Sequence, residues 1–197
     1  VGYSVGGGIV RIGIRNPPVN ALVRDVRAAL VAAFGRAADE EGAVAIILHG
    51  EGVAFASGAE LSETDSPADA PTMAELCARV EASPLPVVVA LHGTVLGAGV
   101  ELALAAHYRG ADADTRIGFP EIKLGLMPSA GATQRLPRLA GAGAALEMLL
   151  SGKLCSIDAA PAAMLADLVV EADALAGAAQ FVAALLEDGG ALRPTSG

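Results

Sequence analysis

Two glutamates, Glu101 and Glu121, stand in surroundings that favour chemistry. Glu101 begins the apolar run Leu102–Ala106, and Glu121 follows Pro120 ahead of a glycine-containing loop. A carboxylate among apolar side chains costs free energy unless it is satisfied, and burial raises its pKa. Taken alone, Glu101 is equally consistent with a surface residue complementing a helix dipole, and Glu121 with a cap of a helical turn. Together they can face each other across one cleft as an acid–base pair.

A glycine-rich turn, Gly97-Ala98-Gly99, precedes Glu101 and follows the apolar run Val87–Leu91. Such a turn feeding a helix presents unpaired N–H groups at the positive end of the helix dipole. Those groups suit a phosphate or a developing oxyanion. A dinucleotide-binding fingerprint is excluded by spacing, because Leu102 stands where a third Gly or Ala is required.

A second segment of small residues, residues 54–61, follows another apolar run at 44–48. Gly58 lets a ligand approach the backbone closely, and the N–H group after it is a candidate hydrogen-bond donor. Alone, this segment is also consistent with an ordinary glycine turn.

Composition excludes several classes of protein. The chain has 197 residues, a net charge of −9 and scattered basic residues, so we expect no nucleic-acid partner. Two Cys residues without a Cys-x-x-Cys pair, and three His residues without ligand spacing, predict no metal. Cys77 and Cys155 are expected to be buried, and His107 to end a helix as a structural cation. No apolar run reaches the ~18 residues of a membrane span, and no signal-peptide pattern opens the chain, so a cytoplasmic protein is expected.

Strand-like and helix-like patterns alternate along the chain, with strands apolar on both faces. This predicts one α/β domain over residues 1–197 with parallel strand pairing. Asn20 is expected to cap the first helix, and the tail after Arg193 is expected to fray. The expected strands are 9–14, 44–48, 87–91, an extended stretch within 108–119, and 168–170; the expected helices are 20–39, 73–81, 97–107, one from 132, 142–150, 157–165 and 175–186.

Four motifs follow one another along the chain: Asn16–Leu22, Phe55–Leu61, Gly97–Arg109 and Phe119–Leu139. In this order and at these separations, they resemble the enoyl-CoA hydratase/isomerase (crotonase) superfamily. The resemblance covers about residues 8–175. The sequence of the motifs is most similar to the hydratase half of bifunctional hydratase/3-hydroxyacyl-CoA dehydrogenases. The resemblance implies a spiral of repeated ββα units, with a core over about 1–155 and a helical segment over about 156–197 that is shorter than usual for the family.

The resemblance also implies roles for individual residues. The backbone N–H groups of Ala59 and Ala98 would bind the thioester carbonyl oxygen of an acyl-CoA substrate. Glu101 would activate a water molecule, and Glu121 would give a proton to C2. No cofactor is implied beyond the CoA of the substrate, and the assembly would be a homotrimer or a dimer of trimers. The residues expected near CoA are Val19, Leu22, Arg24 as a phosphate partner, Ala56 through its carbonyl to the adenine amine, Gly58 and Leu61.

The predicted function is enoyl-CoA hydratase, syn addition of water to 2-enoyl-CoA in fatty-acid β-oxidation. Retention of both glutamates favours it over the alternative of an enoyl-CoA isomerase. A non-catalytic acyl-CoA-binding protein is the alternative from another class. Ala98, where most relatives carry Gly, and the short C-terminal part favour that alternative.

Overall fold

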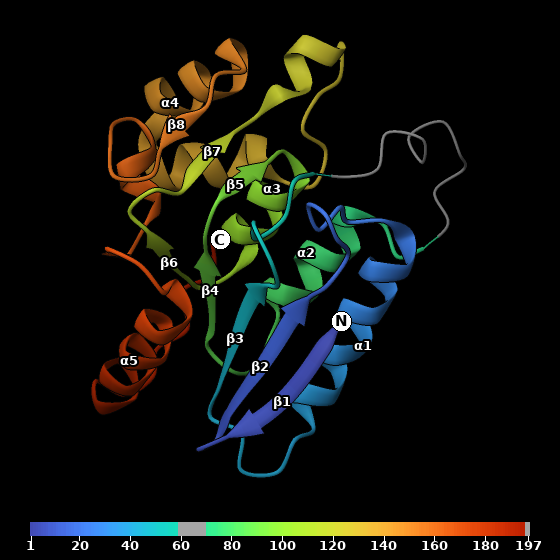
Figure 1. Cartoon of the computed structure of the whole chain (residues 1–197), viewed down its shortest axis with the longest axis vertical. Helices are drawn as coiled ribbons and strands as arrows, with labels where there is room; N and C mark the ends of the chain where they lie inside the picture. The colour runs from blue at the N-terminus through green and yellow to red at the C-terminus, as the bar shows by residue number, and fades with distance from the viewer. Residues whose placement is uncertain (59–69, 196–197) are drawn as a thin grey trace.

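The computed structural model describes residues 1–58 and 70–195, and its main feature is a six-stranded sheet (Figure 1). β1 is antiparallel to β2, and every other neighbouring pair is parallel. All five residues of β4 are buried, as expected for a strand covered on both faces. In spatial order the strands are β1 (Gly2–Gly6), β2 (Ile9–Ile14), β3 (Ala45–Gly50), β4 (Val87–Leu91), β6 (Tyr108–Asp112) and β9 (Leu168–Val170).

A second, smaller sheet consists of β5 (Thr94–Leu96), β7 (Arg116–Gly118) and β8 (Cys155–Ser156). Ser57 adds a parallel bridge to Leu96 at its edge. The chain therefore visits the large sheet, then the small sheet, then a helix. It does so as β4–β5–α3 (Ala98–Ala105) and as β6–β7–α4 (Ala132–Ser151), and β3–Ser57–α2 (Met73–Glu81) follows the same path. This repetition confirms the predicted spiral of ββα units.

Helices cover both faces of the large sheet (Figure 1). α1 (Arg24–Ala38) and α2 lie on one face, over the main cluster of buried apolar side chains. α5 (Ala174–Glu187) lies on the other face, over the second cluster. Within β3, Ile46 belongs to the first cluster and Ile47 to the second, so alternate residues of one strand supply the two cores.

The start of the first helix corrects one prediction. Asn20 has φ of 54°, and α1 begins only at Arg24 with Val23 as its N-cap. The Asn20 amide instead donates to the carbonyls of Glu51 and Ala54, at 2.8 Å each. Its side chain therefore holds two loops together rather than capping the helix.

The C-terminal third contains further differences. The predicted helix 157–165 is only the 3-10 turn η3 (Ala162–Leu165), preceded by Pro161. α4 is interrupted at Gly141, which has φ of 82°, in agreement with two separate helices at 132 and 142–150. β9 lies after residue 155 yet pairs with β6 of the large sheet. The expected boundary near residue 155 stays a prediction.

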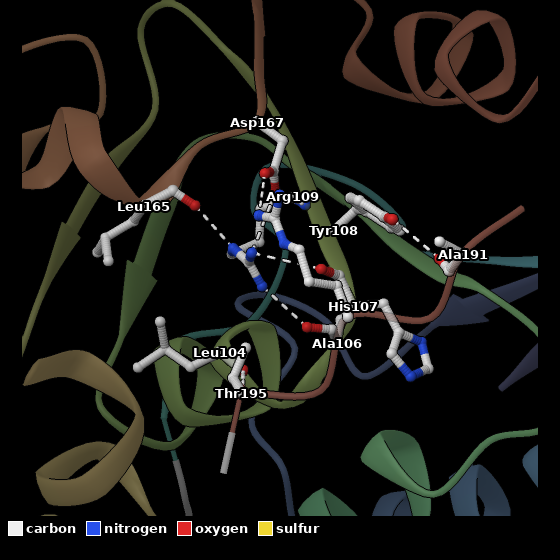
Figure 2. A network of polar contacts seen from close by, with 10 residues as sticks. Leu104, Ala106, His107, Tyr108, Arg109, Leu165, Asp167, Ala191 and Thr195 are labelled. Carbon is white, nitrogen blue, oxygen red and sulfur yellow. Dashed lines mark hydrogen bonds and ion pairs between the residues drawn. The ribbon is translucent and has the colours of Figure 1, made fainter. Parts of the chain in front are cut away.

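The described part of the tail is anchored, so the prediction of fraying is wrong for it. Thr195 is buried, and its hydroxyl donates to the carbonyl of Leu104 at 2.6 Å. The Tyr108 hydroxyl donates to the carbonyl of Ala191 at 2.9 Å (Figure 2). Arg193 pairs with Asp167, which also receives the buried guanidinium of Arg109. These polar contacts hold the segment against the rest of the protein although it contains few apolar side chains.

Gly99 determines how closely α3 approaches the loop that follows β3. A Cβ on Gly99 would overlap the backbone carbonyl of Ala56. We expect Gly99→Ala to destabilise the protein by about 1–3 kcal/mol or more, because backbone cannot move aside as a side chain can. Gly143→Ala is the matched control, since nothing lies within 4 Å of its added Cβ; it should be neutral or stabilising by up to ~1 kcal/mol. Urea unfolding measures both, and equal stability of the Gly99→Ala variant would contradict the packing argument.

Candidate active site

Glu101 lies in the first turn of α3, a helix whose eight residues are all buried. Its side chain is 2% exposed, and Oε1 accepts hydrogen bonds from the N–H groups of Ala130 and Ala132, at 2.8 and 3.0 Å. Burial raises the pKa of the Glu101 carboxyl, and the backbone donors and the charge of Arg135 act against that rise. The carboxylate is therefore desolvated but has partners.

Glu121 lies in the 3-10 turn η2 (Pro120–Leu124) and reaches the start of α3. A Cβ on Gly97 would come within 2.5 Å of Glu121 Oε1, so this carboxyl group lies over that glycine. Glu121 Oε2 is buried and has no hydrogen-bond partner among the described residues. Burial raises the pKa of Glu121, a backbone hydrogen bond at Glu121 itself acts against that rise, and the negative charge of Glu101 raises the pKa further.

The structure thus brings together the two glutamates that sequence reasoning selected. Their environments differ in one respect. Burial raises the pKa of both carboxyl groups. Backbone N–H donors partly offset the rise at Glu101, whereas Glu121 has a buried oxygen without a partner among the described residues and lies near a like charge. Two neighbouring carboxyl groups, one ionised and one protonated, can carry out a paired proton transfer.

The turn before Glu101 carries a candidate oxyanion donor. Ala98 is the first residue of α3, so its N–H group has no acceptor within the helix. Gly97 has φ of 48°, and its own N–H group donates to the carbonyl of Gly118 at 3.0 Å. Ala59, the other predicted donor, lies outside the described residues. The two-donor oxyanion hole therefore stays a prediction.

The predicted CoA-binding segments lie side by side. The Ser57 N–H donates to the carbonyl of Val19 at 3.0 Å, and the Leu22 N–H donates to the carbonyl of Gly58 at 2.9 Å. Val19 is 40% exposed and Arg24 is exposed, so both are accessible to a ligand. Their roles in binding stay predictions.

Two of the predicted CoA residues are used inside the fold. Leu22 is fully buried in the main cluster, so its side chain is not on a binding surface. The carbonyl of Ala56 accepts from the N–H of Leu96 at 3.2 Å and packs against Gly99. Its predicted bond to an adenine amine stays untested. Leu61 lies outside the described residues.

Two other titratable side chains, His107 and Cys77, lie in the interior of the fold. His107 is buried, and its Nδ1 accepts from the N–H of Val87 at 3.0 Å, while burial lowers its pKa. The prediction of a cation at this position is therefore wrong. Cys77 is buried as predicted, with its pKa raised to about 12 by burial, whereas Cys155 is only half-buried. Over residues 1–58 and 70–195, no cluster of three or more His, Cys, Asp or Glu side chains could hold a metal ion.

Sequence reasoning missed the groups that hold Glu101. The donors at Ala130 and Ala132 are backbone N–H groups, which carry no side-chain signal. Gly131 lies between them and has φ of 111°. A glycine at this position was the only sequence signal that could have indicated an unusual turn. The Arg135 guanidinium donates to the carbonyl of Ala130 in this turn. The sequence indicated Arg135 only as a member of one motif and predicted no role for it.

No helix within the described ranges is long and apolar enough to cross a membrane.

Known proteins match this chain over almost its whole length. The enoyl-CoA hydratase/isomerase family model matches residues 4–192. A peroxisomal bifunctional enzyme of Danio rerio is 40% identical over 173 residues, which are 88% of this chain and 24% of that protein. A probable enoyl-CoA hydratase of Bacillus subtilis is 41% identical over 147 residues, 71% of this chain and 57% of that protein. The chain thus spans less than two thirds of the length of these curated relatives.

The fold matches as well as the sequence does. The crystal structure of an enoyl-CoA hydratase from Bacillus anthracis superposes with a TM-score of 0.85 at 30% identity, over 95% of this chain and 76% of that one. Both the ββα spiral and the paired glutamates are therefore found in a chain whose relatives carry hydratase names. Together, these matches show that the chain belongs to the enoyl-CoA hydratase/isomerase family.

Proposed function

We propose that this chain is an enoyl-CoA hydratase, a hydro-lyase that adds water across the double bond of a 2-enoyl-CoA thioester. The observation that carries the proposal is the meeting of Glu101 and Glu121 at the start of α3, where burial raises the pKa of both carboxyl groups and Glu121 Oε2 has no hydrogen-bond partner among the described residues. The names of the relatives support the same reaction.

The reaction needs a base, an acid and a site for negative charge. Glu101 removes a proton from a water molecule as its oxygen bonds to C3. The electrons of the double bond move toward the thioester oxygen, where the N–H groups of Ala98 and Ala59 stabilise the enolate. Glu121 then delivers its proton to C2. Because both carboxyl groups lie near the start of one helix, they would act from one face of the substrate, giving syn addition.

The acyl-CoA would lie along the paired segments that contain Val19 and Gly58, with Arg24 near a phosphate group and Leu61 in the adjoining segment. Leu22 and Ala56 would support this surface from the interior. Fatty-acid β-oxidation is the proposed setting, and no cofactor is proposed beyond the CoA of the substrate. A cytoplasmic location stays a prediction from the sequence. The bifunctional relatives bear peroxisomal names, so they indicate another compartment for those proteins.

An isomerase that moves a double bond with no net water is the second candidate. The unpartnered Oε2 of Glu121 favours it, because one carboxyl group can take a proton from one carbon and return it to another. The non-catalytic alternative loses one of its supports. Ala98 is part of the main buried cluster, so its methyl group packs among core side chains.

Replacement of either glutamate by glutamine tests the hydratase proposal. Absorbance of the enoyl-thioester band should fall when the protein meets crotonyl-CoA or a longer 2-enoyl-CoA. We expect Glu101→Gln and Glu121→Gln each to lower the rate by about 10²–10⁴-fold, the usual contribution of acid–base catalysis. The exposed Glu41→Gln variant is the matched control. A persistent band with the unmodified protein would exclude hydration of those substrates.

The same variants separate the alternatives. With a 3-enoyl-CoA, an isomerase would keep most of its activity in Glu101→Gln and lose it in Glu121→Gln. A binding protein would bind CoA esters with no turnover, and both variants would bind them equally well.

The raised pKa of Glu121 predicts a cost in stability that depends on pH. Because its folded-state pKa lies above its ordinary value, the protonated form favours folding. Stability from this group is present at low pH and is lost as pH rises through the folded pKa. Glu121→Gln should therefore match the Tm of the wild type near about pH 4 and exceed it near about pH 8, where the wild-type carboxyl group must ionise in its buried position. A lower Tm of the variant near pH 8 would contradict the assignment.

A homotrimer, or a dimer of trimers, is the assembly we propose for the chain. Apolar side chains are exposed on η2, on the loop that follows it, on the C-terminal half of α4 and just after α4, and η2 contacts α4. Exposed apolar side chains that gather in one region mark interfaces in soluble proteins. The residues are Ile122, Leu124, Met127, Leu146, Leu150 and Leu154.

Sedimentation equilibrium tests the assembly. Leu150→Glu, at a position 64% exposed, should lower the molar mass to that of a monomer because it places a charge within the apolar surface. Val5→Glu, at an exposed position on the edge strand β1, is the control and should leave the mass unchanged. A wild-type monomer at high protein concentration would refute the proposed assembly.

A further inference from the structure

A buried guanidinium lies directly behind the donors to Glu101. Arg135, in the first turn of α4, is only 7% exposed. Its Nη1 donates to the carbonyl of Ala130 at 2.9 Å. The N–H group of the same residue, Ala130, donates to Glu101 Oε1 at 2.8 Å. One residue therefore joins the guanidinium to the candidate catalytic carboxylate.

The other end of the guanidinium is fixed by an ion pair. Nη2 of Arg135 lies 2.8 Å from Oε2 of Glu81, the last residue of α2, and both side chains are nearly buried. Glu81 Oε1 in turn accepts from the N–H of Thr195 at 2.7 Å. The Thr195 hydroxyl donates to the carbonyl of Leu104 on α3, the helix that carries Glu101. Polar contacts thus close a frame through α2, α3, α4 and the tail.

The glycine between the two donors makes this arrangement possible. A Cβ on Gly131 would overlap the Arg135 guanidinium, and the φ of 111° at Gly131 is one that other residues rarely adopt. Arg135 therefore packs against the turn that holds the N–H groups of Ala130 and Ala132. Displacement of Arg135 would leave this turn without the contact that sets its shape.

We propose that Arg135, held in place by Glu81 and Thr195, is the positioning residue for Glu101: it fixes the turn whose two backbone N–H groups orient the carboxylate that activates water. The proposal deepens the hydratase assignment and rests on it. Arg135 touches neither substrate nor water in this role, because it acts through the carbonyl of Ala130.

Charge acts in the same direction as geometry. Among residues 1–58 and 70–195, the charged and titratable groups that face Glu101 are Cys77 from α2, Glu121 from η2 and Arg135 from α4. Among them Arg135 is the one cation, and its charge lowers the pKa of Glu101 against the effect of burial. Its loss should raise that pKa, so that the acid side of the pH–rate profile moves to higher pH.

The test compares Arg135→Met and Arg135→Lys with Arg138→Met. Arg138 is on the same helix, and its side chain bonds only to Gln134 among the described residues, so it serves as the matched control. Each full-length variant is measured for Tm, for kcat and KM on crotonyl-CoA over a range of pH, and for titration of the Glu101 carboxyl by ¹³C NMR. The Glu101→Gln variant assigns that resonance.

We expect Arg135→Met to lower kcat by about 10–100-fold with KM little changed, since a misplaced catalytic group costs up to about 10²-fold. The acid limb and the NMR titration of Glu101 should both move to higher pH. Arg135→Lys keeps a cation but not the two-pronged contact, so it should fall between Arg135→Met and the wild type. Thr195→Val, which removes the hydroxyl contacts of the tail, should shift both readouts slightly in the same direction, and Arg138→Met should shift neither.

Unchanged pH profiles and an unchanged Glu101 titration in folded Arg135 variants would overturn the proposal, whatever their Tm. If Arg135→Met does not fold, Arg135→Lys and Thr195→Val decide by the same two readouts. The NMR titration separates the two proposals. A shifted titration in a protein that hydrates no substrate would retain the positioning role and refute the hydratase assignment.

Discussion

The structure depends most on how one buried carboxylate is satisfied. Glu101 is the sole charged residue of α3, a helix packed on all sides, and a charge in such a place requires donors. The donors come from Ala130 and Ala132, about thirty residues further along the chain. To deliver them, the turn at Gly131 must reach the first turn of α3. That requirement fixes where α4 begins, and hence how the third turn of the spiral lies on the second.

Small residues allow these layers to come together. α3 is built from Ala, Gly, Val and Leu around its one glutamate, and the backbone of Gly99 contacts the carbonyl of Ala56. Gly97 leaves room for the Glu121 carboxyl group. The alanine-rich composition and low aromatic content of the chain are thus the consequence of backbone segments that lie close to one another around the two carboxyl groups.

Much of the fold could be predicted from local patterns. α2, β4 and β9 have the predicted bounds, because each is a short run with a clear cap, a proline or a change to polar residues at its ends. The two glutamates were found because their type is unusual for their surroundings. What could not be predicted depends on contacts between distant segments. Asn20 serves two loops rather than a helix end, and Thr195 is buried by Glu81 and Leu104, which lie far from it in the sequence.

The backbone donors explain why the sequence predicted the two glutamates but not the groups that hold Glu101. The chemistry of a side chain can be inferred from its residue type. The N–H groups of Ala130 and Ala132 do not differ in the sequence from other backbone N–H groups, and only the fold brings them to Glu101. Yet those two groups lower the pKa of the Glu101 carboxyl against the effect of burial. Glu121 has no such donors for Oε2, and a buried acceptor without a partner is rare in folded proteins. Such a group lowers stability when ionised, and in the proposed mechanism this cost accompanies a use, because Glu121 delivers its proton to the substrate.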